Sequence, residues 1–238
     1  MTTRANALDV IDLTAGYGRI EVLHGITFSV PVGAVVALLG PNGAGKTTTL
    51  NCISGVMSPS GGHVHVGGHH LNGAAPDALA RAGLCTIPEG RGIFPNLTVA
   101  ENVSLFAFAA RATLREIEER SYTQFPRLGE RRSQLAGRLS GGEQQMLAMA
   151  RALSTGPAVL LLDELSMGLA PKIVEDLYAI VGEIARQGVS VLVVEQFARR
   201  ALAVAQLGIV MVQGRVTAMG EPADIEGELS AAYLGGAA

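Results

Sequence analysis

The apolar positions of this chain fall into short runs, separated by stretches with a helical period. Apolar runs of four to six residues are typical of parallel strands that are buried on both faces. The runs cover residues 35–39, 84–87, 159–162 and 189–194. We expect these four segments to form the parallel centre of a sheet.

Alternating patterns and turn signals predict further strands towards both ends of the chain. Residues 8–13 alternate between apolar and polar side chains, and a second strand follows the loop expected at Gly16-Tyr17-Gly18. Further along, Gln213-Gly214 separates two apolar segments, which is a hairpin signal. The chain should therefore contain an antiparallel β part before the central strands and a hairpin after them.

Amphipathic helical patterns connect the strands. Residues 171–186 place apolar side chains at every third or fourth position after a proline that can start a helix. The stretch from about residue 98 to residue 138 is also helical in period, with Leu114, Ile117 and Phe125 on one stripe. We expect this stretch to form a helical part that is inserted into the alternation of strands and helices.

One segment between a strand run and a helix pattern carries a strong chemical signal. It fits G-x-x-x-x-G-K-[ST], a pattern that binds nucleoside triphosphates when a strand precedes it and a helix follows it. Glycines let backbone N–H groups converge on the phosphates, the lysine reaches the β- and γ-phosphates, and the threonine ligates Mg²⁺. The predicted nucleotide-binding residues are Gly40, Pro41, Asn42, Gly43, Ala44, Gly45, Lys46, Thr47 and the adjacent Thr48.

Two adjacent acids end the apolar run at residues 159–162. Open α/β sheets keep their ligands at the carboxyl ends of the strands, so these carboxylates should emerge beside the nucleotide. Asp163 can hold the hydration shell of Mg²⁺, and Glu164 can orient or deprotonate the attacking water. The segment therefore predicts a hydrolytic site.

Two further features point to the nucleotide. Ser140-Gly141-Gly142 opens a helix pattern and makes a second anion-binding helix start, far in sequence from the first. Tyr17, held between glycines upstream of the phosphate loop, can stack on a nucleobase. Whether both helix starts contact the same nucleotide is a question for the structure.

Together these elements predict an α/β fold with a phosphate-loop core, a mixed sheet, an N-terminal antiparallel β part and an inserted helical subdomain. We expect one domain over residues 1–238. Its core should comprise residues 1–87 and 157–238, and the helical subdomain should comprise residues 88–156, approximately.

Composition narrows the functional classes. The net charge is −3 and the pI is near 6.0, so no nucleic-acid partner is expected, because such proteins usually show a basic excess. The apolar runs are far shorter than the roughly 20 residues of a membrane helix. The N-terminus lacks the apolar core of a signal peptide. We therefore expect a cytoplasmic chain that reaches a membrane only through a partner.

Histidines and cysteines offer weaker signals. Four of the five histidines lie between residues 63 and 70, and a period of two puts His63 and His65 on one face of a strand. A metal site is conceivable there, but a solvated strand face is the favoured interpretation. Cys52 and Cys85 lie in apolar segments and should be packed thiols.

With the phosphate loop, the Leu-Ser-Gly-Gly-Glu-Gln string at residues 139–144 and the Asp163-Glu164 strand end, nearly the whole chain resembles an ATP-binding-cassette (ABC) ATPase. The resemblance implies ATP and Mg²⁺ as cofactors. It implies a head-to-tail homodimer or heterodimer in which the Ser140 region, including Glu143, closes over ATP on the other subunit. It also implies transmembrane permease subunits, an indirectly linked substrate-binding protein, and a peripheral position on the cytoplasmic face of the membrane.

Several residues depart from the general cassette pattern. Glu89 stands where cassettes usually place glutamine, and Gln196 stands where they place a switch histidine. The resemblance still assigns both to the site, Glu89 as a nucleotide and metal contact and Gln196 as a catalytic residue beside Lys46 and Glu164. The loop that begins at Ser166 ends in Ala170 rather than in the usual aspartate.

Four short stretches of the sequence, given at the end of this paragraph, are similar to the corresponding stretches in one of the two ATPase subunits of branched-chain amino acid importers. Leu165 and Phe197 depart even from that subgroup, and related cassettes serve urea, amides and other amino acids. A soluble cassette acting on DNA or ribosomes remains an alternative, as does a phosphate-loop kinase, although a kinase needs neither Ser140-Gly141-Gly142 nor paired acids. The four stretches are Pro-Glu-Gly-Arg at 88–91, Ser-x-Gly-Leu-Ala-Pro at 166–171, Val-Glu-Gln at 194–196 and Ala-Tyr-Leu-Gly at 232–235.

Overall fold

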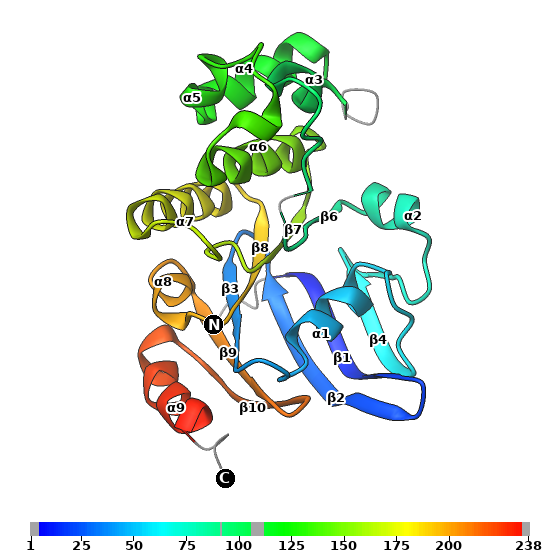
Figure 1. Cartoon of the computed structure of the whole chain (residues 1–238). Coiled ribbons are helices and arrows are strands. Elements are labelled where there is room, and N and C mark those ends of the chain that lie inside the picture. The colour runs from blue at the N-terminus through cyan, green and yellow to red at the C-terminus, as the bar shows by residue number, and fades with distance from the viewer. Residues whose placement is uncertain (1–4, 91, 106–111, 235–238) are drawn as a thin grey trace.

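The computed structural model describes residues 5–90, 92–105 and 112–234 (Figure 1). Arg91 and Gly235, which belong to two of the importer-like stretches, lie outside the described residues. The strands are β1 (Asn6–Tyr17), β2 (Ile20–Pro31), β3 (Val35–Leu39), β4 (Gly61–Val66), β5 (His69–His70), β6 (Leu84–Ile87), β7 (Val159–Asp163), β8 (Ser190–Glu195), β9 (Leu207–Val212) and β10 (Arg215–Gly220). The helices are α1 (Lys46–Ile53), α2 (Pro76–Arg81), α3 (Val99–Ser104), α4 (Leu114–Gln124), α5 (Pro126–Gly129), α6 (Gly141–Ser154), α7 (Pro171–Arg186), α8 (Ala198–Leu202) and α9 (Pro222–Leu234), with a 3₁₀ turn at Ala136–Arg138.

Two sheets organise the described residues. The central sheet has the order β10-β9-β3-β8-β7-β6, and the N-terminal sheet has the order β2-β1-β4-β5. In the central sheet β9, β3, β8, β7 and β6 run parallel, and β10 pairs with β9 in the antiparallel sense. The N-terminal sheet is antiparallel throughout. This confirms the predicted α/β class, with its mixed sheet and its N-terminal antiparallel part.

The central strands are apolar on both faces because both faces are covered. On β3, Val35, Ala37 and Leu39 face one hydrophobic core, while Val36 and Leu38 face the other. The first core includes apolar side chains of α6, α7, α8 and α9, and the second includes those of α1 and the N-terminal sheet. All five residues of β3 are buried, as expected of a parallel strand between two layers.

The hairpin of β9 and β10 forms at the predicted Gln213-Gly214 turn. Both turn residues have positive φ, 46° and 73°, as a type I′ turn requires. A Cβ atom on Gly214 would lie 1.8 Å from the carbonyl oxygen of Val22, so only glycine fits there. Gly214 also donates its N–H to the carbonyl oxygen of Ala44 at 2.9 Å. The hairpin tip therefore supports the phosphate loop.

The expected loop at Gly16-Tyr17-Gly18 is shorter than predicted. β1 continues through Tyr17, which pairs with Ile20, and the chain turns at Gly18 and Arg19. A Cβ atom on Gly16 would lie 2.2 Å from the carbonyl oxygen of Ile20, so this glycine serves close strand pairing rather than a loop. The prediction of a loop at Gly16 and Tyr17 was wrong because glycine was taken as a loop signal.

Helices α3 to α6 lie together beyond the edge of the central sheet (Figure 1). Thr98 caps α3 in a capping box with Glu101, as its sequence indicates. The continuous helical period that we expected to about residue 138 is interrupted, and Leu114 is 45% exposed while Ile117 and Phe125 are buried. Leu114 therefore does not share their buried stripe. Its place at the first position of α4, next to the N-cap Thr113, explains the difference.

Candidate active site

The carboxyl ends of three neighbouring strands build the site. In the register of the sheet, Leu39 at the end of β3 pairs with Glu195 at the end of β8, and Val194 pairs with Asp163 at the end of β7. The residues that follow these strand ends are therefore level with one another. The start of the phosphate loop, Gln196 and Glu164 follow the three strands directly. The sheet thus brings the start of the phosphate loop to Gln196, although more than 150 positions separate Gly40 from Gln196 in the sequence.

The phosphate loop needs glycine where other backbone approaches it. A Cβ atom on Gly40 would lie 2.2 Å from the carbonyl oxygen of Met211. Gly45 has a φ of 100°, and its Cβ would lie 2.8 Å from a methyl group of Leu23. These contacts hold the loop between β9 and β2, with the start of α1 directly after Gly45. The backbone N–H groups at this helix start can therefore converge on an anion.

Lys46 is buried at the first position of α1 and hydrogen-bonds to its own loop. Its Nζ donates to the carbonyl oxygens of Gly40 at 2.8 Å and Pro41 at 3.1 Å. Burial lowers the pKa of the Lys46 ammonium, and the negative charges of Glu164, Asp163 and Glu195 oppose that shift. The ammonium is thus held inside a loop shaped for phosphate, close to acidic side chains.

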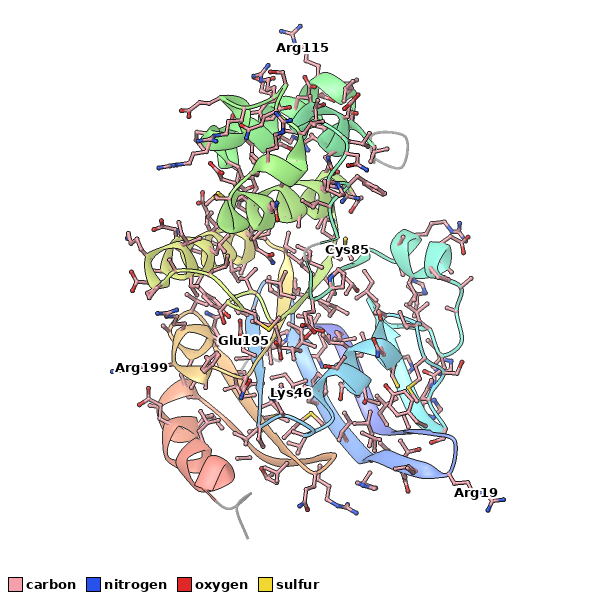
Figure 2. All side chains as sticks on the ribbon, viewed as in Figure 1. Arg19, Lys46, Cys85, Arg115, Glu195 and Arg199 are labelled. Atoms are coloured by element: carbon pink, nitrogen blue, oxygen red, sulfur yellow. The ribbon has the colours of Figure 1, made fainter. Side chains whose placement is uncertain are left out.

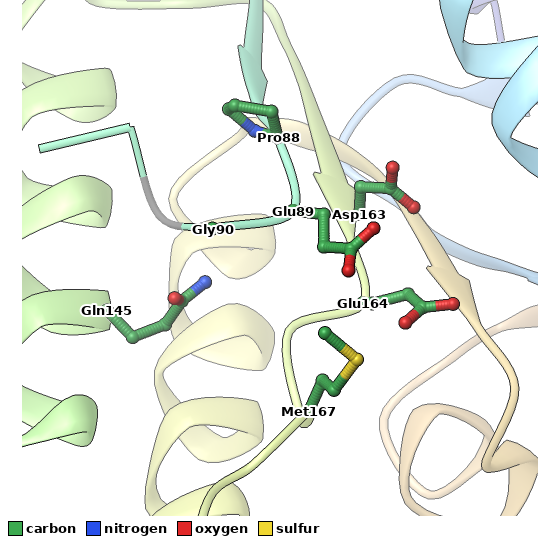
Figure 3. A pocket seen from close by; sticks show the side chains of 7 residues that line it. All are labelled: Pro88, Glu89, Gly90, Gln145, Asp163, Glu164 and Met167. Atoms are coloured by element: carbon green, nitrogen blue, oxygen red, sulfur yellow. The ribbon is translucent and has the colours of Figure 1, made fainter.

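Glu89, Asp163 and Glu164 line a common cavity of about 220 Å³ (Figure 3). Burial and the neighbouring charges of Glu164 and Glu89 raise the pKa of Asp163 to about 6. Glu89 is exposed at the end of β6, and Gln145 reaches the same cavity from α6. Acids gathered in this way repel one another, so the cavity favours a bound cation.

The residues present fit Mg²⁺. The Oδ1 atom of Asp163 is buried and has no hydrogen-bond partner within the described structure, and such an atom is available to a cation or to water bound by a cation. Thr47 is exposed at the start of α1, so its hydroxyl is open to a ligand. Asp163 and Thr47 are therefore the residues that would hold the ion, with Glu89 on the cavity wall.

Gln196 and Glu164 follow adjacent strands. The backbone N–H of Glu164 donates to the carbonyl oxygen of Val194 at 2.9 Å, which ties the catalytic candidate to β8. Glu164 has a φ of 47°, a left-handed conformation that is uncommon and strained for a residue with a side chain. Gln196 is half-buried and lies two residues after Val194.

The second predicted anion-binding helix start lies apart from the phosphate loop. Figure 1 shows α6 and α1 in separate parts of the molecule, and Ser140, Gly141 and Gly142 do not line the acidic cavity. Ser140 caps α6 in a capping box with Glu143. The Glu143 carboxylate accepts hydrogen bonds from the N–H and Oγ of Ser140, at 2.9 and 2.8 Å, and pairs with Arg131 at 3.2 Å. Its contacts lie within the helical part.

Tyr17 lies at the tip of the β1–β2 hairpin, and its side chain is 56% exposed. Its partner Ile20 is three residues from Leu23, the residue of β2 that contacts the phosphate loop at Gly45. Three residues of a strand span about 10 Å. The ring is therefore near the loop and open to solvent, a position from which it can meet a base.

Two residues at the site carried no functional prediction. Gln145 lines the acidic cavity, and Glu195 is buried within hydrogen-bonding distance of Ser166 and Tyr178. The sequence signal for Glu195 was its place at the end of a largely apolar strand, where a buried acid needs partners. Gln145 gave no signal beyond its place in the Leu-Ser-Gly-Gly-Glu-Gln helix.

The histidine segment forms a cluster outside this site. His63 Nδ1 lies 3.2 Å from His70 Nε2, and the His65 ring is next to both. In the described part of the chain, no group of three or more His, Cys, Asp or Glu side chains is arranged to hold a metal ion. Cys52 is buried, Cys85 is half-buried, and both thiols are free.

Comparison with known proteins finds similarity over most of the chain. Residues 23–166 match the family model described as ABC transporter. The chain is 40% identical over 223 residues, 92% of its length and 96% of the relative, to the high-affinity branched-chain amino acid transport ATP-binding protein BraG of Pseudomonas aeruginosa. It is 33% identical to the probable branched-chain amino acid transport ATP-binding protein LivF of Archaeoglobus fulgidus, covering 88% of this chain and 89% of the relative.

A solved structure supports the same assignment. The ADP conformation of an ATP-binding cassette of an ABC transporter superposes with a TM-score of 0.87 and is 25% identical in sequence. The similarity covers 97% of this chain and 99% of that one. Within the residues that our structure describes, no helix has the length and hydrophobicity to span a bilayer.

The raised pKa of Asp163 predicts that the ionised Asp163 carboxylate destabilises the folded protein at neutral pH. The stability that comes from the protonated carboxyl is fully present below the unfolded pKa of about 4 and is lost as pH rises through about 6. In EDTA without nucleotide, we expect Asp163→Asn to raise the melting temperature at pH 8 by a few degrees, about 1–3 kcal/mol. The gain should fade as pH falls towards 4.

Thermal unfolding of both proteins between pH 4 and pH 8 measures this effect. Glu226→Gln, at an exposed acid of α9, is the matched control and should give a much smaller change. A melting temperature that Asp163→Asn lowers, or raises equally at every pH, would contradict the electrostatic account of this site.

Proposed function

Because this chain belongs to the ABC transporter family, an ATPase family, we propose that it powers an importer for branched-chain or related amino acids. The observation that carries the proposal is the meeting of the phosphate loop, Asp163-Glu164 and Gln196 at the carboxyl ends of β3, β7 and β8. This arrangement places a triphosphate beside two acids that can hold a cation and activate water.

The relatives support an amino acid as the transported class. The proteins named BraG, BraF and LivF all carry branched-chain amino acid transport in their names, and BraG is 40% identical to this chain against 32% for BraF. Other relatives, at 30–34% identity, are named for ribose import, Nod factor export and lipopolysaccharide export. The substrate is therefore chosen by membrane and binding subunits, and urea or amides remain the alternative cargo.

The chemistry follows from the positions of the side chains. Lys46 would exchange the carbonyl oxygens of Gly40 and Pro41 for the β- and γ-phosphates of ATP. Glu164 would take a proton from the attacking water. The water oxygen would bond to the γ-phosphorus while the bond from that phosphorus to the β–γ bridging oxygen breaks, which gives ADP and inorganic phosphate. Mg²⁺, held by Asp163 and Thr47, would neutralise charge on the phosphates. Gln196 would donate its amide N–H to a γ-phosphate oxygen.

We also propose that the active site is shared between two cassettes. The Ser140 helix start is built for an anion but lies away from the phosphate loop of its own chain. A head-to-tail pair, closed by a two-fold axis, would set Ser140-Gly141-Gly142 of one subunit against the nucleotide on the other. The second cassette is another copy of this chain or a homologue similar to BraF.

The segment from Phe94 to Val103 is our candidate for contact with the membrane subunits. Phe94 is 48% exposed, with Arg151 over one face of its ring at 4.8 Å, and aromatic and arginine side chains are enriched at protein interfaces. The buried amide of Asn102 fixes the backbone below it, accepting from the Phe94 N–H and donating to the Phe94 carbonyl, each at 2.9 Å. The segment thus presents the exposed Phe94 ring and the half-buried Leu97 on a rigid support. The chain would then sit on the cytoplasmic face of the membrane.

A reconstituted transporter tests the proposed function. The chain should copurify with its permease subunits, and leucine, isoleucine or valine with the binding protein should stimulate its ATPase. Phe94→Asp and Leu97→Asp should abolish that stimulation while the basal ATPase of the isolated chain stays within about twofold, because neither residue touches the nucleotide site. Arg19→Asp at the hairpin turn is the matched control. Stimulation by urea or amides alone would replace the cargo, and stimulation unaffected by either change would remove the docking assignment.

Mixing two inactive variants tests the shared site. Lys46→Ala removes the phosphate-loop function and Ser140→Arg blocks the helix start, so each should be inactive alone. In a mixed dimer one composite site keeps both intact parts, and ATPase should partly return. The wild-type rate should also rise faster than linearly with protein concentration in the nanomolar range. A linear wild-type rate together with no recovery on mixing would refute the shared site.

A further inference from the structure

The mechanism above leaves one buried carboxylate beside the site without a role. Glu195 ends β8, and its side chain is 1% exposed. Burying a carboxylate is costly unless donors satisfy it, so the structure must give Glu195 partners. Figure 2 shows Glu195 and Lys46 in the same central region of the molecule.

Three donors from two other elements satisfy Glu195. Its Oε1 accepts from the backbone N–H of Ser166 at 2.9 Å and from the hydroxyl of Tyr178 at 2.8 Å. Its Oε2 accepts from the hydroxyl of Ser166 at 3.0 Å. All three partners can donate a hydrogen bond to the carboxylate, so its two oxygens are satisfied although it is buried.

Tyr178 holds this network from α7. The side chain is 3% exposed, and burial together with the charge of Glu195 raises the pKa of its phenol well above the ordinary value. The hydroxyl therefore stays protonated and remains a donor at all physiological pH values. Glu195 is in this way attached to α7 on one side and to the loop after β7 on the other.

The loop that Glu195 holds is the one that carries Glu164. Ser166 lies two residues after Glu164, whose backbone is in the left-handed conformation and is tied to β8 through Val194. Left-handed residues with a side chain persist only where surrounding contacts fix them. The two hydrogen bonds from Ser166 to Glu195 are such contacts. On the other side, Glu195 is joined by a peptide bond to Gln196.

We propose that Glu195 is a positioning residue for hydrolysis, whose carboxylate fixes the Glu164–Ser166 turn against the end of β8. It thereby sets Glu164 for the attacking water and Gln196 for the γ-phosphate in one rigid unit. The loop at residues 166–170 begins at Ser166, so the hydrogen bonds from Ser166 to Glu195 also fix the start of that loop. This inference deepens the proposed function and depends on it.

Glu195→Ala tests the proposal first. We expect kcat for ATP to fall about 10- to 100-fold, less than the roughly 10²- to 10⁴-fold worth of the general base itself, because Glu195 acts only through the position of Glu164. The KM for ATP should change by less than about threefold, since the contacts of Glu195 are to Ser166 and Tyr178 and not to the phosphate loop. The wild-type chain is measured alongside: an inactive wild type would sink the proposed function, whereas an active wild type with an equally active variant would sink only this inference.

Glu195→Gln separates position from charge. The amide oxygen can still accept from the Ser166 N–H and the Tyr178 hydroxyl, and the amide nitrogen can donate to the Ser166 hydroxyl after that group rotates. The geometry is kept and the charge is lost. If Glu195 acts by positioning, kcat of Glu195→Gln should be at least tenfold higher than kcat of Glu195→Ala. The same loss in both variants would overturn positioning and assign the effect to the negative charge near Lys46.

Ser190→Ala is the matched control. Ser190 lies at the other end of β8, is also 1% exposed, and its hydroxyl accepts a hydrogen bond from the Gly33 N–H at 3.0 Å. This change should lower the melting temperature and leave kcat within about twofold. If kcat falls in proportion to the melting temperature in both Glu195→Ala and Ser190→Ala, the loss reflects general packing and the proposal is overturned.

A combined variant keeps the test decisive if Glu195→Ala does not fold. Ser166→Ala with Tyr178→Phe removes two of the three donors and leaves the carboxylate in place. It should lower kcat several-fold at unchanged KM. In a Glu164→Gln background the same pair of changes should cost little more, because Glu195 acts through Glu164. If the pair of changes lowers the single-turnover hydrolysis rate by the same factor in the wild-type and Glu164→Gln backgrounds, Glu195 does not act through Glu164.

Discussion

Negative charge gathered around buried Lys46 is the constraint on which the site depends. Asp163, Glu164 and Glu195 all act on the lysine, opposing the effect of burial on its pKa. The acids also act on one another: burial first, and then the charges of Glu164 and Glu89, raise the pKa of Asp163. A site of this kind is unfavourable for the folded protein alone. A bound cation would offset the charge of these acids, so ligand binding and folding would be linked through the same groups.

The two-layered core makes this charge cluster possible. Each central strand buries one set of side chains against helices and the other set against α1 and the N-terminal sheet. The strand ends are therefore fixed from both faces, which keeps the backbone positions of the acids at those ends close together. The phosphate loop is held in a similar way, by close contacts of Gly40 with β9 and of Gly45 with β2. A rigid scaffold thus carries a strained turn at Glu164.

Local chemistry explains which parts of this arrangement could be predicted from the sequence. The phosphate loop and the Asp163-Glu164 strand end are contiguous motifs whose context can be read from a few neighbouring residues. Glu195 was missed because Ser166 and Tyr178, its partners, are 29 and 17 positions away, and only the register of β7 and β8 brings them together. The loop predicted at Gly16 was wrong, because this glycine is required by close pairing of β1 with β2 and not by a turn.

The most direct test of the account measures ATP hydrolysis and ATP binding by Glu164→Gln on the same preparation. It asks whether Glu164 activates the attacking water while Asp163 serves the cation. The account predicts that Mg²⁺-dependent ATP binding is retained while single-turnover hydrolysis falls by about 10²-fold or more, because the amide cannot take the proton of the attacking water. Unchanged hydrolysis, or binding and hydrolysis lost to the same extent, would contradict it.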